Sequence, residues 1–246
     1  MTATATFVET PVLLFDIPWS TYTGILEALP EHRFRHTYDR GTFEIYSPLV
    51  YNVSWESYEQ ILAAFGDRHF RHTYSDGTLE IMSPSESHEW FKEFVGRLIE
   101  MAAFQLRMPI KCVGSTTLRH PKLIQGLEPD LAYYVQREPK VRGRHSLVGM
   151  KKPPPDLAIE IEITRKLLDR LEAYATLGVP EVWRFRDGVI TFFVLKTKQY
   201  REVKSSLAFP ALKSRDINRF LARLDDEDEQ SILESFVEWL REGQTP

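Results

Sequence analysis

An internal repeat at the front of the chain constrains the fold more than any other sequence feature. Residues 17–48 align without a gap on residues 53–84 at a shift of 36 residues, and the segment FRHTY at 34–38 recurs at 70–74. Each copy predicts a short helix followed by a hairpin, because helically spaced apolar residues precede two strand-like runs that flank a turn. Two copies are too few for a solenoid, which needs at least three. The repeat therefore indicates a local duplication beside or within one domain.

The two copies continue differently along the chain. The second runs into Ser83-Pro84-Ser85-Glu86, which predicts a helix capped by Ser83, and then into an apolar stripe at helical spacing from Phe91 to Leu106. The first copy has no such continuation. We therefore expect residues 1–52 to be an N-terminal extension, 53–212 to form the core with the second copy integrated, and 213–246 to add helices that pack on it.

Composition sets limits on the class of protein. The 246 residues are 43% hydrophobic and 27% charged, with a net charge of −4 and one cysteine, Cys112. A single cysteine rules out an internal disulfide framework and fits a reducing compartment. No apolar run approaches the roughly 18 residues of a membrane helix, and MTATATFVET lacks the pattern of a secretory signal. We expect a cytoplasmic protein without a membrane partner, while the charge neither supports nor excludes DNA as a partner.

The middle and end of the chain mix strands with helices. Residues 156–164 alternate apolar and polar side chains as a strand does, and a helix is predicted over 165–177, capped by Thr164. A hairpin is predicted across Asp187-Gly188, and two amphipathic helices lie near 214–224 and 231–241. This order predicts an α/β or α+β fold with a central sheet.

Several acids stand where such a sheet could gather them. Glu160 and Glu162 share one face of their strand, about 7 Å apart at their Cα atoms given a rise of about 3.3 Å per residue. Asp130 begins another predicted strand, and Glu80 belongs to the second repeat copy. Carboxylates brought together in this way can hold Mg²⁺. Taken alone, the alternating strand is more typical of a half-buried strand whose acids lie in water.

Three segments together resemble a known family. Glu128-Pro129-Asp130-Leu131, then 155–162 (PDLAIEIE), then 174–183 (YATLGVPEVW) are similar in order and spacing to the Uma-two family of putative restriction endonucleases, in the PD-(D/E)XK nuclease superfamily. The segment 77–84 (GTLEIMSP), with His88 beyond it, is similar to the N-terminal signature of that family. The resemblance spans roughly residues 53 to 240.

The resemblance implies a restriction-endonuclease-like mixed central sheet flanked by helices. It also implies an endonuclease that hydrolyses DNA phosphodiester bonds with Mg²⁺, or Mn²⁺ in its place, as cofactor. Asp130 matches the PD aspartate and Glu160 the (D/E) position. Both would bind the metal, with Glu80 as a third ligand.

The chain departs from the superfamily pattern at one position. The motif lysine is replaced by Glu162, and in many family members the basic residue lies on the following helix, where this chain has Arg170 with Lys166 one turn earlier. We expect Asp130, Glu160, Glu162 and Arg170 to form the catalytic group. Arginine stabilises phosphate charge but cannot act as a base, so the alternative is a catalytically impaired nuclease fold that binds DNA or protein.

Three further features carry hypotheses. The loop 137–154 is rich in Lys and Arg and is either a phosphate-binding flap or an ordinary solvated loop. His88 reaches the site or lies in solvent, and the solvated position is favoured. The duplicated unit at 17–48 is a candidate interaction device, by edge pairing or swapping, in an expected homodimer.

Overall fold

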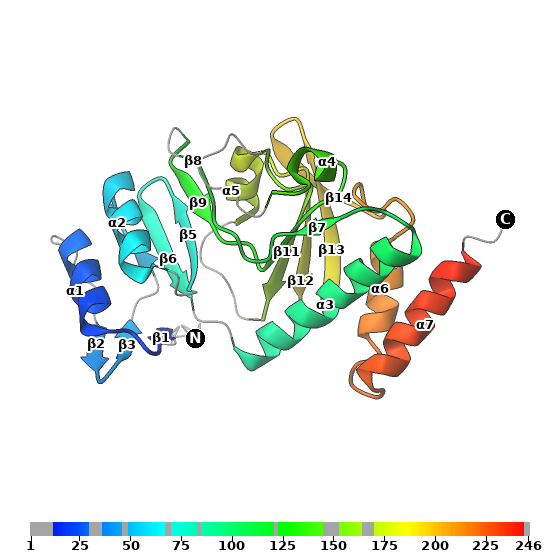
Figure 1. The fold of residues 1–246 in the computed structure, drawn as a ribbon, viewed down its shortest axis with the longest axis horizontal. Coiled ribbons are helices and arrows are strands. Elements are labelled where there is room, and N and C mark those ends of the chain that lie inside the picture. The colour runs from blue at the N-terminus through cyan, green and yellow to red at the C-terminus, as the bar shows by residue number, and fades with distance from the viewer. Residues whose placement is uncertain are drawn as a thin grey trace, which may run out of the picture. The chain divides into compact units, whose positions relative to one another are not determined.

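The computed structural model describes residues 12–29, 36–45, 49–66, 70–82, 85–120, 123–144, 153–163 and 170–243. The chain divides into two compact units (Figure 1): unit 1 is Met1–Pro84 with Arg119–Leu127, and unit 2 is Ser85–Leu118 with Glu128–Pro246. Both repeat copies belong to unit 1. The domain limits at residues 52 and 212 remain a prediction, because compactness does not test independent folding. Within the described residues, no helix has the length and apolar character needed to cross a membrane.

Unit 1 contains two helices and two sheets. The helices are α1 (Trp19–Ala28) and α2 (Trp55–Phe65). The described strands of the first sheet run in the order β1 (Val12–Leu14), β3 (Thr42–Ile45), β2 (His36–Asp39). Those of the second run in the order β4 (Leu49–Val50), β6 (Thr78–Met82), β5 (Arg71–Ser75), β9 (Gln125–Leu127), β8 (Leu118–His120). One hydrophobic core, with members from both copies, packs α1 and α2 against these strands.

The copies repeat in structure as they do in sequence. Tyr38 donates its hydroxyl hydrogen to the Ile17 carbonyl at 2.7 Å, and Tyr74 donates to the Val53 carbonyl at 2.8 Å. The helix N-terminus of the second copy is as predicted, since the Ser54 side chain accepts from the Ser57 amide at 3.0 Å. The helix-and-hairpin interpretation of the repeat is therefore confirmed.

The structural repeat begins earlier than the sequence comparison indicated. In β1, Leu13 stands opposite Glu44, and in β4, Leu49 stands opposite Glu80, again 36 residues further on. The following loops also match, because Asp16 and Asn52 have φ angles of 55° and 58°. Each unit of the repeat is therefore a strand, a helix and a hairpin.

Unit 2 is built on a six-stranded sheet. Its order is β14 (Gln199–Val203), β13 (Val189–Lys196), β12 (Glu181–Arg186), β11 (Leu157–Glu162), β10 (Leu131–Tyr134), β7 (Lys111–Cys112). The pair β11–β12 is parallel, and the other pairs are antiparallel. The described helices are α3 (Glu86–Gln105), α4 (Glu138–Val141), α5 (Arg170–Leu177), α6 (Ser214–Leu221) and α7 (Glu229–Glu242). The predicted α+β fold with a mixed central sheet flanked by helices is confirmed.

The core of unit 2 lies between this sheet and α3, α6 and α7 (Figure 1). Leu157, Ile159 and Ile161 of β11 enter it, as their alternation predicts. The helix α3 is capped by Ser85, whose side chain accepts from the His88 amide at 3.2 Å. The predicted cap Ser83 lies outside the described residues, and Ser85 holds the cap position because it directly precedes the first helical turn.

The acidic run 225–229 takes part in the contacts of the last helix. Asp228 caps α7, since its carboxylate accepts from the Ser231 amide at 3.0 Å. Glu227 pairs with Arg223, and Glu229 accepts from the indole of Trp90. Residues of this run therefore cap α7 and connect its start to α3.

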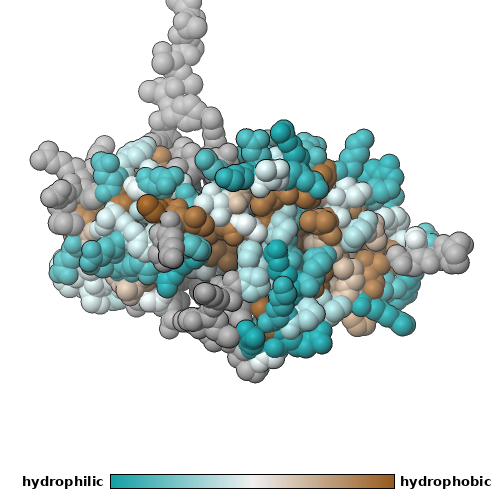
Figure 2. Space-filling view, turned by 90° about the horizontal axis from the view of Figure 1, so that it is seen from above, coloured by the Kyte–Doolittle hydropathy of each residue, from teal (hydrophilic) through white to brown (hydrophobic). Residues whose placement is uncertain are grey.

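Large hydrophobic side chains also reach the surface at several points. In the view of Figure 2, brown areas interrupt the teal hydrophilic surface. Independently of that view, the exposed large hydrophobic or aromatic side chains include Phe15, Trp19, Tyr51 and Phe104, the last at 86%. Three of these four belong to unit 1, where they lie in or beside the repeat copies.

Candidate active site

Two of the predicted catalytic acids face each other across neighbouring strands of unit 2. Because β10 and β11 pair with Leu131 opposite Ile159, Asp130 at the start of β10 stands opposite Glu160. Directly opposed residues of an antiparallel pair point to the same face. The Asp130 carboxylate accepts from the Ile161 amide at 2.6 Å, which fixes its orientation. Asp130 is 2% exposed and Glu160 is 1% exposed.

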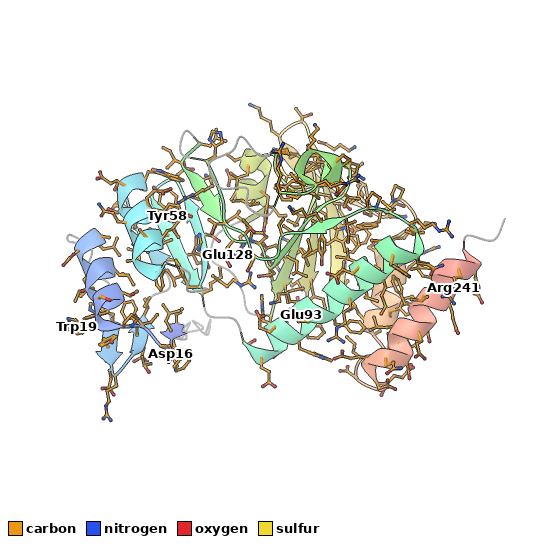
Figure 3. The ribbon with its side chains drawn as sticks, viewed as in Figure 1. Asp16, Trp19, Tyr58, Glu93, Glu128 and Arg241 are labelled. Carbon is orange, nitrogen blue, oxygen red and sulfur yellow. The ribbon has the colours of Figure 1, made fainter. Side chains whose placement is uncertain are left out.

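Helix α5 places the guanidinium of Arg170 and the phenol of Tyr174 next to this acidic pair. Arg170 Nη2 lies 3.0 Å from Glu160 Oε1 and also donates to the carbonyl oxygen of Glu128, a residue labelled in Figure 3. One turn later, Tyr174 donates its hydroxyl hydrogen to Glu160 Oε1. Residues four apart share a helix face, so a single face of α5 supplies both groups.

The charges of this cluster are set by burial and by each other. Burial lowers the pKa of Arg170, but the Glu160 carboxylate, with smaller contributions from Tyr174 and Asp130, outweighs this and raises it overall. Burial, reinforced by Glu160, raises the pKa of Tyr174 well above its ordinary value. Arg170 is therefore a permanent cation, and Tyr174 keeps its proton as a hydrogen-bond donor.

His88 also belongs to the cluster. It sits in the first turn of α3, is 8% exposed, and places Nε2 3.2 Å from Asp130 Oδ2. Its other ring nitrogen, Nδ1, lies 3.2 Å from Glu89 Oε1. The favoured sequence interpretation, a solvated His88, is wrong, because the cap at Ser85 directs the first turn of α3 toward the start of β10.

The interpretation of β11 as a strand with its acids in water is also wrong. All six of its residues are buried. The alternation correctly separates the two faces, but α5 covers the face that bears Glu160. Alternation reports the two sides of a strand and cannot report whether both are covered.

Of the remaining predicted site residues, Glu162 has a partner on the neighbouring strand. Glu162 accepts from Arg186 Nε at 2.6 Å, across the parallel pair β11–β12. Glu80 lies in β6 of unit 1 and is 2% exposed. Lys166 lies outside the described residues. Over the part of the chain that the structure describes, no group of three or more His, Cys, Asp or Glu side chains is placed to hold a metal ion.

The basic loop is partly occupied by contacts within the chain. Arg137 lies 3.5 Å from Asp156, and Arg142 pairs with Glu138 at 2.5 Å on the short helix α4. Lys140 is exposed. Lys151 and Lys152 lie outside the described residues. The first part of this loop is therefore held by ion pairs of Arg137 and Arg142 within the chain.

Sequence reasoning missed Tyr174 as a member of the cluster. The signal was present, because Tyr174 follows Arg170 by four residues and opens the segment YATLGVPEVW that carries the family resemblance. Its importance depends on Glu160 lying under α5, which spacing along the chain cannot show.

A mixed sheet that buries an aspartate and a glutamate beside an arginine is an arrangement suited to binding and polarising an anionic ester. Comparison with known proteins gives the family. The Uma2 family model, described as putative restriction endonuclease, matches residues 55–221, and the chain belongs to this nuclease family.

One solved structure is also similar to this chain. The crystal structure of a putative nuclease belonging to DUF820 from Anabaena variabilis ATCC 29413 is similar with 12% sequence identity and a TM-score of 0.44, covering 61% of this chain and 90% of that one. No curated protein matches the chain.

Proposed function

We propose that this protein is a Mg²⁺-dependent endonuclease that hydrolyses DNA phosphodiester bonds, with Mn²⁺ able to replace Mg²⁺. The observation that carries the proposal is the opposed pair Asp130 and Glu160, buried on one face of the sheet next to Arg170. Family membership supports the same reaction class. The expected homodimer and the cytoplasmic location both stay part of this proposal. The location rests on the lone cysteine, which fits a reducing compartment.

The donor set of the site fits Mg²⁺. This ion takes oxygen ligands and is commonly held by one or two carboxylates, with water and phosphate oxygens completing its shell. Asp130 and Glu160 would hold it, and two carboxylates satisfy the requirement without a third protein ligand. Bound there, the ion would polarise the phosphate and lower the pKa of a water molecule.

The other residues have roles that follow from their protonation. Arg170 stays charged and can stabilise negative charge on the phosphate oxygens, but it cannot accept a proton. Tyr174 orients the Glu160 carboxylate through its hydroxyl hydrogen bond and is also no base at neutral pH. Neither Arg170 nor Tyr174 can therefore remove a proton from the attacking water.

Plasmid cleavage tests the proposal. Purified protein with Mg²⁺ or Mn²⁺ is expected to nick supercoiled plasmid, and Asp130→Asn and Glu160→Gln are each expected to lower the rate at least about a hundredfold. Glu172→Gln, on an exposed position of α5, is the matched control and should retain activity. Nicking that persists in both site variants would refute the assignment.

The second candidate is a nuclease fold that binds DNA without cleaving it. It is favoured by Glu162, which takes the place of the motif lysine and is paired with Arg186. Saturable DNA binding without cleavage under either metal would support it. In both cases, neutralising Lys140 and Arg144 of the basic loop is expected to weaken DNA binding and reduce its salt dependence.

A further inference from the structure

In the second repeat copy, the outer edge of the hairpin is filled by a distant strand. Strand β9 pairs antiparallel with β5, with Gly126 opposite Tyr74 and Leu127 opposite Thr73. Copy two therefore shows what this edge accepts: a short extended segment that forms backbone hydrogen bonds.

The glycine in that segment is a steric requirement. A Cβ atom added at Gly126 would lie 2.3 Å from the Tyr58 hydroxyl oxygen and 2.8 Å from Cζ of the same ring. Tyr58 stacks on Tyr74 at 4.6 Å between ring centroids, and it covers the backbone of β9. Any residue larger than glycine would have to displace this ring.

The first copy holds the same aromatic pair in the same geometry. Tyr22 stacks on Tyr38 at 4.6 Å between ring centroids, and its hydroxyl lies 3.2 Å from His36 Nε2, as the Tyr58 hydroxyl lies 2.9 Å from His72 Nε2. The tyrosines of copy two are at most 1% exposed, whereas Tyr22 and Tyr38 are only partly buried.

The outer edge of β2 is not paired with any strand of the described part of the chain, where β2 ends its sheet. The hairpin turn Arg40-Gly41 has φ angles of 44° and 91° and closes a two-residue loop between the register partners Asp39 and Thr42. The pair that closes a hairpin turn of this kind is a hydrogen-bonded pair. Because hydrogen-bonded and non-hydrogen-bonded pairs alternate, the N–H and C=O of Tyr38 point away from β3. Tyr74 occupies the corresponding position and is the residue opposite Gly126.

We propose that the outer edge of β2, with Tyr22 and Tyr38, binds an extended, glycine-containing segment of another protein by strand addition. The glycine lies opposite Tyr38 and under the Tyr22 ring, as Gly126 lies under Tyr58. Trp19, labelled on α1 in Figure 3 and 63% exposed, has its ring 5.5 Å from that of Tyr38 and borders this site. Main-chain hydrogen bonds would supply the affinity. The requirement for glycine at one position would supply the specificity.

The occupant is not the same edge of a second copy. Strand β2 reads His-Thr-Tyr-Asp and contains no glycine. Pairing two β2 edges would place a side chain under Tyr22 in either chain. Self-pairing therefore meets the steric conflict that Gly126 avoids in copy two.

A labelled peptide that copies residues 123–129 (LIQGLEP) is the probe, and fluorescence polarisation with the full chain is the assay. We expect saturable binding, and binding at least about tenfold weaker when alanine replaces the glycine of the peptide. In the Tyr22→Ala protein, which opens the space above the glycine, the two peptides should bind within about threefold of each other. Tyr38→Pro, which removes the outward N–H, should abolish binding, while Asp39→Ala should not change it.

Circular dichroism confirms that each variant is folded, and if Tyr38→Pro is not, the Tyr22→Ala comparison alone decides. Failure of the glycine peptide to bind, or equal binding of both peptides to the unmodified protein, would overturn the proposal. Binding that is indifferent to Tyr22→Ala would show that the peptide displaces β9 instead. A dimer that disappears in Tyr38→Pro would show that the occupant is a second copy.

Discussion

Removing the Arg170 side chain should destabilise unit 2 strongly, because it leaves the Glu160 carboxylate buried without its cation. The two side chains are 2% and 1% exposed and lie 3.0 Å apart. At an effective dielectric constant of about 20, two unit charges at that distance attract by about 5 kcal/mol. Removing one partner of a buried pair costs about 3–5 kcal/mol. For Arg170→Met, we expect the lower part of that range, because Tyr174 still donates to the carboxylate.

A double-mutant cycle isolates this interaction. Glu160→Gln combined with Arg170→Met removes both charges, so the double variant should recover most of the loss and give a coupling energy of about 2 kcal/mol or more. At about 2–4 °C per kcal/mol, the single Arg170→Met variant should melt about 6–12 °C lower in calorimetry.

The control is Arg215→Met, because Arg215 is 78% exposed beside Asp216 and a surface pair contributes about 0–1 kcal/mol. If Arg170→Met lowers stability by less than about 1 kcal/mol, or if the double variant is less stable than the single one, the guanidinium does not compensate a buried charge. The reasoning about the site would then be wrong.

Two further predictions concern single groups. Cys112 is exposed, but desolvation by the groups around it, with added repulsion from Glu100, raises the pKa of its thiol above the ordinary value. Alkylation by iodoacetamide should therefore be slow at pH 7 and accelerate about tenfold per pH unit toward pH 9. Glu100→Gln should speed the reaction at neutral pH, and a pH-independent rate would contradict this. Gly126→Ala should cost about 1–3 kcal/mol through its clash with Tyr58, whereas Gly243→Ala, whose Cβ would be 3.5 Å from its nearest neighbour, should be near neutral; equal melting temperatures would count against the steric argument.

The sequence predicts elements well where one local pattern determines them. The alternation of β11 identifies its core face, and the spacing in α2 together with the cap at Ser54 defines that helix. The duplication predicts that two segments share one conformation. It also contains a weaker signal that was missed, since Leu13 and Leu49 precede the aligned region at the same shift.

The candidate site was harder to predict, because its members meet only through tertiary structure. Asp130 and Glu160 come from a motif, but the positions of His88 and Tyr174 depend on how α3 and α5 pack on the sheet. The pairing of Glu162 with Arg186 likewise depends on β11 and β12 being parallel neighbours. None of these contacts leaves a periodic trace in the sequence.

Duplication gives the protein two modules with different freedom to diverge. The hairpin of the second module is locked between β4 and β9, so substitutions at Tyr58 or Tyr74 disturb a closed sheet. The first module has the same tyrosine–histidine contacts, but its tyrosines are only partly buried and its strand β2 ends the described sheet. Substitutions should therefore be tolerated more readily around α1 and β2, where a change of binding specificity disturbs less of the surrounding structure than it would around α2 and β5.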